Sequence, residues 1–392
     1  MTIHLAAVDP GLAQTLTAWR RHLHAYPELS RQEAETAAYI QARLTELGVP
    51  FQAGIGGHGV VATISRGASN RSVGLRADMD ALPIAETTGK PYASTRPGVM
   101  HACGHDGHAA SLLGAAALLA RDTDWTGTVH LVFQPAEEGG GGAKAMIADG
   151  LFARFPMERI FGYHNWPGLE AGTVAVHDGP VMAASARIEI VVKGHAGHAA
   201  QPHLARDPMV ASAHLLLALQ TLVSRNVDPL DTVVLSMCTI EAGTAANQIP
   251  DKAVMRGTMR TLRAAVTGAM EDGIHRIASG IGQTFGMQID VAIRHGIGVT
   301  TNTPADAALA ANGAAAAGLT VRRDLPPSMA GEDFSWLLRE RPGAFVWIGN
   351  GPASPKNALH NPGYDFNDAI LPAASVCLAG MAIRALQADL ST

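Results

Sequence analysis

The sequence predicts an α/β protein in which a small domain is inserted into a larger one. The chain has 392 residues, too many for one domain of typical size, and 47% of them are apolar, which is enough for two buried cores. Apolar strands alternate with helical patterns in the N-terminal part, which indicates a sheet with covered faces. The pattern changes near residue 184 and returns after residue 295, which indicates the insertion.

The larger domain is expected to contain a helix that starts after residue 30. Ser30 and Glu33 form a capping-box pattern, apolar residues follow at helical spacing, and Gly48 suits a left-handed cap at the helix end. The elements predicted after it are strands at 60–64, 73–75, 128–133, 159–163 and 344–348, with helices at 107–120 and 143–148. Ligands of such sheets collect beyond the carboxyl ends of the strands.

The inserted segment contains six predicted elements of its own. They are strands at 185–192, 232–240, 252–260 and 288–294, and helices at 208–223 and 263–285. The order strand-helix-strand-strand-helix-strand is that of the ferredoxin-like fold. We therefore expect a larger, discontinuous domain of residues 1–183 and 296–392, and an inserted α+β domain of residues 184–295.

Composition and charge exclude several classes of partner. The formal net charge of -5 offers no basic surface for nucleic acid. The three cysteines, Cys103, Cys238 and Cys377, cannot form a disulfide framework, and their odd number indicates a reducing compartment. The N-terminus does not resemble a secretory signal, and the densest apolar stretch, 112–120, is too short for a bilayer. We expect a cytoplasmic protein that acts on small molecules, without membrane partners.

A cluster of metal donors lies upstream of the strand at 128–133. Cys103 and His105 are two positions apart, and on a turn or an extended segment both side chains can face one ion. A lone buried cysteine is more often structural. Here further donors lie within reach along the chain, namely His101, Asp106 and His108. This context favours a metal site.

Two adjacent carboxylates, Glu137 and Glu138, follow the strand at 128–133. Their side chains diverge, so one can bind a metal while the other reaches a metal-bound water. A Glu-Glu pair in a solvated loop would carry no function, but burial near a sheet is costly for an unpaired carboxylate. A thiolate, an imidazole and a spare carboxylate can together hold a divalent cation and activate water. These residues predict a metal-dependent hydrolase.

Four more polar residues follow predicted strands or lie in loops, and their own spacing does not decide their role. His164 and His360 could be ordinary core or surface histidines, and Asp78 and Asp80 could be helix caps. The glycines at 139–142 could also form a phosphate cradle, although the Lys-Ser/Thr ending of such loops is missing.

Four motifs along the chain combine these polar residues. They are Arg-Ala-Asp-Met-Asp-Ala-Leu-Pro at 76–83, Met-His-Ala-Cys-Gly-His-Asp-Gly-His at 100–108, Pro-Ala-Glu-Glu-Gly at 135–139 and Leu-His-Asn-Pro at 359–362. They resemble the motifs of the aminoacylase and hippurate hydrolase family of two-metal metallopeptidases, which includes amidohydrolases of indole-acetyl amino acids and of N-acetyl-diaminopimelate. The resemblance covers almost the whole chain. It implies a zinc-peptidase-like catalytic domain with an inserted lid and dimerisation domain.

The resemblance also implies roles for the residues in these motifs. Glu137 is implied as the general base and Asp80 as the residue that orients a ligand. Related peptidases carry His-x-Asp where this chain has Asp78-Met79-Asp80, so the role of Asp78 stays open. The ligands of two divalent metal ions, with Cys103 between the ions, would be Cys103, His105, Glu138, His164 and His360.

For the inserted domain, the resemblance implies that His198 stabilises the oxyanion in a neighbouring subunit's site, so a homodimer or higher homo-oligomer is expected. Asn247 and Arg260 match positions that bind the carboxylate end of the substrate. His195 and His203 receive no role.

The function expected from these residues is hydrolysis of an N-acyl amino acid, either hippurate-like or N-acetylated, to a carboxylate and a free amino acid. The alternative is an exopeptidase or dipeptidase that uses the same site. A binding protein with a relic site would lack a base or a ligand, and none is missing from the motifs. The donor types accept zinc or manganese, and also cobalt or nickel. The acyl group and the preferred amino acid stay open.

Overall fold

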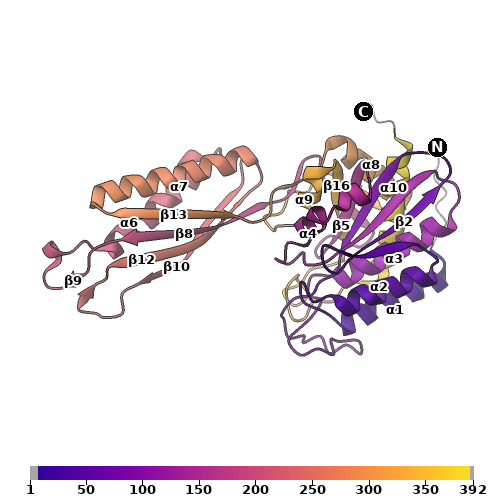
Figure 1. Cartoon of the computed structure of the whole chain (residues 1–392), viewed down its shortest axis with the longest axis horizontal. Coiled ribbons are helices and arrows are strands. Elements are labelled where there is room, and N and C mark those ends of the chain that lie inside the picture. Colours follow the sequence, from indigo (N-terminus) through magenta and orange to yellow (C-terminus); the bar gives the residue numbers. More distant parts are fainter. Residues whose placement is uncertain (1–7, 389–392) are drawn as a thin grey trace. The chain divides into compact units, whose positions relative to one another are not determined.

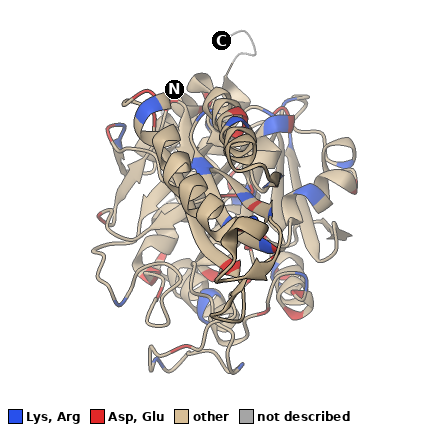
Figure 2. Ribbon diagram, turned by 90° about the vertical axis from the view of Figure 1, so that its left-hand side faces the viewer, with Lys and Arg blue, Asp and Glu red and all other residues tan. Residues whose placement is uncertain are grey.

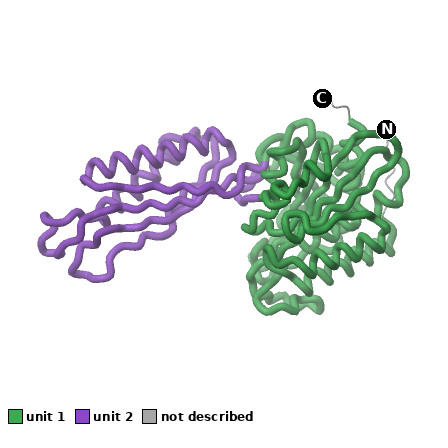
Figure 3. Tube along the Cα trace, viewed as in Figure 1, with its two compact units in different colours: residues 1–181, 301–326, 333–392 green, residues 182–300, 327–332 purple. Residues whose placement is uncertain are grey.

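The computed structural model describes residues 8–388 (Figure 1), which divide into two compact units (Figure 3). Among the described residues, unit 1 contains 8–181, 301–326 and 333–388, and unit 2 contains 182–300 and 327–332. The segment 327–332 lies outside the predicted insertion, but the backbone amide of Ala183 donates to the carbonyl of Ala330 at 2.9 Å. This pairing makes the segment part of unit 2.

Unit 1 is built on an eight-stranded sheet in the order β1-β2-β4-β3-β5-β16-β6-β15. The central strands β4, β3, β5 and β16 run parallel, and β1 and β2 continue the sheet in antiparallel pairing. The strands are β1 Phe51–Ile55, β2 Gly59–Arg66, β3 Ser72–Asp78, β4 Gly127–Gln134, β5 Arg159–Trp166, β6 Thr173–Ala175, β15 Thr320–Arg322 and β16 Gly343–Gly349.

Helices cover this sheet: the Ala- and Gly-rich α3 and α10 pack on it side by side, and α1 packs against α3. Among the described residues, the segment Asp368–Gln387 is long and apolar enough to cross a membrane by length and composition, but it is largely buried in the core of unit 1. The helices are α1 Pro10–Ala25, α2 Ala34–Glu46, α3 His105–Arg121, α4 Gly142–Ala148, α5 Leu151–Arg154, α8 Pro304–Ala316, α9 Ser335–Glu340 and α10 Leu371–Gln387.

The predicted strands and helices of the larger domain are confirmed, but the capping box is wrong. Gly48 ends the helix region at φ +68°, as expected. Glu33 occupies the N-cap position of α2 without a side-chain cap. Its carboxylate accepts from the amide of Ala136, and Ser30 donates to Asp80 instead. Partners distant in sequence therefore replace the local hydrogen bonds of the motif.

Unit 2 has the ferredoxin-like topology that the element order predicted. Its four strands form an antiparallel sheet in the order β10-β12-β8-β13, with α6 and α7 packed against it. The elements are β8 Ala184–Lys193, α6 Pro208–Thr221, β10 Val233–Ala242, β12 Lys252–Thr261, α7 Ala264–Phe285 and β13 Gln288–His295. Short pairs are formed by β9 Gly197–His198 with β11 Gln248–Ile249, and by β7 Pro180–Met182 with β14 Thr300–Thr301.

Candidate metal centre

The sheet of unit 1 brings the predicted donors to one edge. The strands β3, β4 and β5 are parallel, so the residues at and beyond their carboxyl ends lie together. Asp80 follows β3, Glu137 and Glu138 follow β4, and His164 lies near the end of β5. His105 begins α3 at the same edge.

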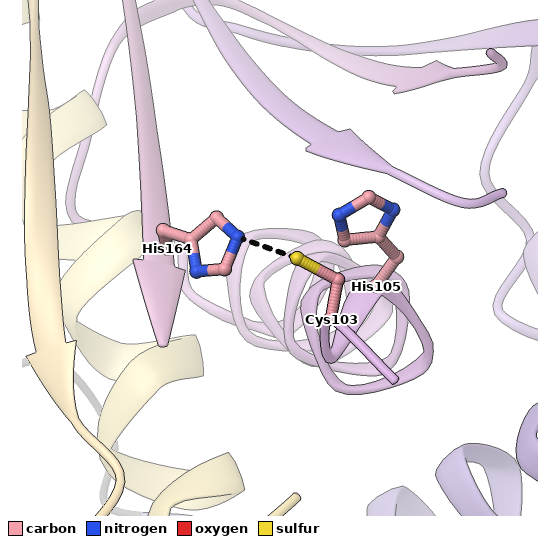
Figure 4. A group of neighbouring side chains, drawn as sticks. All are labelled: Cys103, His105 and His164. Atoms are coloured by element: carbon pink, nitrogen blue, oxygen red, sulfur yellow. Dashed lines mark hydrogen bonds between the residues drawn. The ribbon is translucent and has the colours of Figure 1, made fainter. Parts of the chain in front are cut away.

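Cys103, His105 and His164 form the most buried part of the cluster (Figure 4). One ligand atom of each lies within 4.8 Å of the others, and the Cys103 Sγ is 3.3 Å from the His164 Nε2. Gly104 between the first two has φ +99°, and a Cβ there would lie 2.3 Å from the Asn165 Oδ1. Only glycine therefore allows the turn that aims Cys103 and His105 at one point.

A second group shares the cysteine and extends the cluster. Cys103, Glu138 and His360 also have ligand atoms within 4.8 Å of one another, and the His360 Nε2 is 3.2 Å from the Glu138 Oε1. His105, Glu137 and Glu138 form an overlapping group. The structure thus brings together all five predicted ligands and Glu137, with Cys103 common to two groups.

The chemistry of the donors fits a cation. The buried His105 Nε2 has no hydrogen-bond partner among residues 8–388, which would be costly without a ligand. The Glu138 Oε1 lies between two imidazoles, 3.2 Å from the His360 Nε2 and 3.9 Å from the His105 Nε2. Burial, and then Glu138, raise the pKa of the Cys103 thiol well above its ordinary value. Burial, and then His108, lower the pKa of His164, which keeps its ring neutral. A divalent ion would satisfy the open donor atoms and favour the thiolate.

Asp80 positions both the carboxylate loop and a candidate ligand. Its carboxylate accepts from the backbone amides of Glu137 and Glu138, both at 3.1 Å, and from the Ser30 hydroxyl at 2.6 Å. Its backbone carbonyl lies 2.9 Å from the His105 Nδ1, so a proton there leaves the His105 Nε2 free to face the cluster.

Two further contacts fix the loop that carries Glu137. Ala136 has φ +55°, an unusual conformation for alanine, and its amide donates to the buried Glu33 at 2.8 Å. Burial raises the pKa of the Glu33 carboxyl. The Glu137 Oε1 accepts from the backbone amide of Asp333 at 3.1 Å. The backbone next to Glu137 and the tip of its side chain are therefore both held in place.

The structure places Asp78, whose role the sequence left open, in a buried network beside the cluster. One carboxylate oxygen lies 2.6 Å from the His108 Nδ1, and the other accepts from Arg76 at 2.6 Å. Burial opposes the ionised form, but His105 and Arg76 hold the pKa of Asp78 well below its usual range. The ionised carboxylate of Asp78 is therefore the hydrogen-bond acceptor that holds His108.

The candidate residues of unit 2 fall into two separate places. His198 and Gln248 pair between β9 and β11, and the Ala199 amide donates to the Asn247 carbonyl at 3.0 Å. Arg260 lies eight residues along β12 from Lys252, which is about 26 Å at about 3.3 Å per residue. Within one chain, His198 and Asn247 lie together, while Arg260 lies towards the other end of the sheet.

The sequence profile of Peptidase family M20/M25/M40 matches residues 74–384. The chain belongs to this family. It is 40% identical over 379 residues to an N-acetyl-L-cysteine deacetylase from Bacillus subtilis, covering 96% of this chain and 90% of that protein. It is also 40% identical over 372 residues to a hippurate hydrolase from Campylobacter jejuni, covering 94% and 96% of the two chains.

A solved structure supports the same assignment. The Bacillus subtilis YXEP protein, a dinuclear metal binding peptidase from the M20 family, matches with a TM-score of 0.87 at 35% identity. The match covers 97% of this chain and 99% of that one. The large sheet with its donor cluster is therefore the fold of an M20 peptidase.

In this M20 family member, a buried charge network that the sequence analysis missed lies behind the start of α3. Asp106 accepts from Arg20 at 2.8 Å and lies 2.8 Å from the His24 Nδ1. Burial alone would lower the pKa of His24, but hydrogen bonds to Asp106 and Glu86 raise it to about 9. Arg20 and His24 are four residues apart on α1, so the sequence indicates that they share one face of the helix. It does not indicate that this face contacts Asp106.

We expect unit 1 to be less stable at alkaline pH, because His24 loses its stabilising charge there. Its pKa rises from 6.5 to about 9 on folding, so its stabilising effect is complete below pH 6.5 and is lost as the pH rises through 9. The effect amounts to about 3 kcal/mol. His24→Gln should lower the melting temperature at pH 6 and change it little at pH 10. A difference that does not vary with pH would contradict this role.

Ser30→Ala should lower the catalytic activity, and its effect on the stability of α2 should be the smaller of the two effects. Ser30 donates to the buried Asp80, and a hydrogen bond to a charged group contributes about 1.5 kcal/mol, so kcat/KM should fall roughly 10-fold. Thr45→Ala is a matched control, because the Thr45 hydroxyl only donates within α2 to the Gln41 carbonyl. Unchanged kcat/KM with a lower melting temperature would instead support the helix cap.

Proposed function

We propose that this protein is a metal-dependent amidohydrolase that cleaves N-acyl amino acids to a carboxylate and a free amino acid. The observation that carries the proposal is a buried, complete donor set with the carboxylate of Glu137 beside it. The names of two relatives, an N-acetyl-L-cysteine deacetylase and a hippurate hydrolase, support this substrate class. A small-molecule substrate and a cytoplasmic location are part of the same proposal.

Two divalent metal ions would be held by Cys103, His105, Glu138, His164 and His360, among which Cys103 belongs to two of the donor groups. Zinc or manganese suits one thiolate with imidazoles and carboxylates, and cobalt or nickel could replace them. When bound, the ions polarise the scissile carbonyl and make water more acidic. The buried His105 Nε2, which has no hydrogen-bond partner among the described residues, supports this assignment.

Glu137 moves the proton in this mechanism. Its carboxylate accepts a proton from the attacking water, whose oxygen bonds to the amide carbon, and then delivers the proton to the leaving nitrogen as the C–N bond breaks. Its amide is held by Asp80 and its Oε1 by the Asp333 amide, so the group keeps one orientation through both transfers. Asp80 acts as a positioning residue.

The residues of unit 2 complete the site from two subunits. His198 donates to the oxyanion, and Asn247 and Arg260 bind the carboxylate end of the substrate. His198 and Arg260 lie too far apart along the unit 2 sheet to contact one small substrate from one chain. We therefore assign His198 to the partner's site, in a homodimer where unit 2 serves as lid and dimerisation domain.

The surface of unit 2 supports such a dimer. Among the described residues, the strand β10 lies at the edge of the sheet and pairs with β12 alone. Its Val234 and Ile240 are exposed, and on α6 Leu217 is 70% exposed. An open strand edge beside apolar side chains is suited to contact with a second copy.

An exopeptidase or dipeptidase is the second candidate, since the family is a peptidase family and the same groups would cleave a peptide bond. Only the pocket for the acyl side would differ. Rates on hippurate, N-acetyl amino acids and dipeptides distinguish the two functions.

Glu137→Gln should abolish turnover while metal content stays intact. General-base catalysis contributes about 10²- to 10⁴-fold, so kcat on the best N-acyl amino acid should fall at least about 100-fold. Metal content is measured by mass spectrometry after purification. The exposed Glu170→Gln in unit 1 is the control and should keep wild-type turnover. Retained activity in Glu137→Gln would remove Glu137 from the mechanism.

Co-expression of Glu137→Gln with His198→Ala should restore activity that each variant lacks alone. In a heterodimer, one site combines the intact Glu137 of one subunit with the intact His198 of the other. Random pairing gives about one quarter of wild-type activity. Size-exclusion chromatography with light scattering should show a dimer. A fully active monomer, or no recovery in confirmed heterodimers, would contradict shared sites.

A further inference from the structure

One face of the unit 2 sheet is not covered by the helices of that unit. Along β12, buried Met255 and Met259 face α6 and α7, so Thr258 and Arg260 point to the opposite face. Arg187 of β8 lies directly opposite Thr258, and Arg294 of β13 lies directly opposite Arg187. Arg187, Arg260 and Arg294 therefore share the open face.

The acidic residues on this face are already paired with other cations. Arg256 donates to Glu189 at 2.8 Å and to Glu241 at 2.7 Å, and Lys193 lies 2.6 Å from Asp290. Among residues 8–388, neither Arg187, Arg260 nor Arg294 has a carboxylate partner. The only side-chain hydrogen bond found for Arg260 goes to the carbonyl of Met259.

This concentration of positive charge costs free energy. Like charges directly opposite on neighbouring strands are destabilising, which applies to Arg187 and Arg294. Burial, and then the charge of Arg187, lower the pKa of Arg260. Only 16% of residues in the chain are charged, and the formal net charge is -5. Most of the ribbon in Figure 2 is accordingly tan, the colour of the uncharged residues. Three unpaired arginines on one face therefore stand out, and a bound anion would relieve their repulsion.

The same face is hollowed into a space for a small molecule. A cavity of about 540 Å³ is lined by Arg187, Thr258 and Arg294, and by Arg256 with its two carboxylate partners, Glu189 and Glu241. Arg260 lies two residues beyond Thr258, diagonally across from Arg187, where cross-strand neighbours are about 7–8 Å apart. Such a distance suits two carboxylates joined by a short carbon chain.

We propose that Arg187 and Arg294 bind a second carboxylate of the substrate, beside the one held by Arg260. This inference rests on the proposed function, in which Arg260 grips the α-carboxylate of an N-acyl amino acid. The preferred substrates are then dianions. The second carboxylate belongs either to an acidic amino acid or to a dicarboxylic acyl group, and planar guanidinium groups recognise both.

The test compares substrates matched in shape but not in charge. The pairs are N-acetyl-L-glutamate with N-acetyl-L-glutamine, and N-succinyl-L-alanine with N-succinamoyl-L-alanine. The wild type should favour the dianion of at least one pair in kcat/KM. Arg187→Gln with Arg294→Gln should lower this ratio about 10-fold, because charged hydrogen bonds are lost. The pair that responds identifies the source of the second carboxylate.

Arg276→Gln is the matched control, since it removes an exposed arginine from α7, on the covered side of the same sheet. The Arg276→Gln variant should keep the wild-type ratio of kcat/KM between the two substrates of each pair. If this ratio fell as much as in the double variant, the subsite would be overturned. Equal ratios in the wild type and the double variant would also overturn it. If the double variant does not fold, the two single substitutions are measured in the same way.

Calorimetry with glutarate separates failure of the subsite from failure of the proposed function. The double variant should bind glutarate about 10-fold more weakly than the wild type and Arg276→Gln do. This result supports the anion subsite even if no N-acyl amino acid is cleaved, which would refute only the proposed function. Unchanged glutarate affinity would overturn the subsite, even with hydrolysis intact.

Discussion

The carboxylate of Asp80 ties together the segments that form the candidate site. It accepts from two consecutive amides in the loop after β4 and from the hydroxyl of Ser30, while its own carbonyl fixes the ring of His105. Hydrogen bonds to a buried charge are stronger than neutral ones, and each donor left without its partner would cost free energy. The loop with Glu137 and Glu138 is thus held against the sheet by the fold itself.

Much of this arrangement was predictable because its signals are local. The strands of unit 1 are short apolar runs bounded by glycines and polar residues. In unit 2, segments with the apolar spacing of strands and of helices follow one another in the ferredoxin-like order. The donors were found because Cys103, His105 and the two glutamates lie in compact motifs. His164 and His360 were assigned by resemblance alone, since neither has a distinctive neighbour in sequence.

The features that the sequence did not predict depend on partners far along the chain. Ser30 and Glu33 have the spacing of a capping box, yet both side chains bond to buried partners at least 50 residues away in the sequence. Arg20 and His24 meet Asp106 across more than 80 residues. The open face of unit 2 also needed strand register, because only pairing shows that Arg187 and Arg294 are opposite each other.

The two outer imidazoles of the cluster differ in their access to solvent. The side chain of His360 is 52% exposed and stands on a loop residue with φ +62°, whereas His164 is buried and lies on a central strand. Water and chelators can therefore reach one end of the cluster while the other stays closed off. With the ligands proposed above, a chelator would meet the donors at the His360 end first, while unit 1 itself shields those at the His164 end.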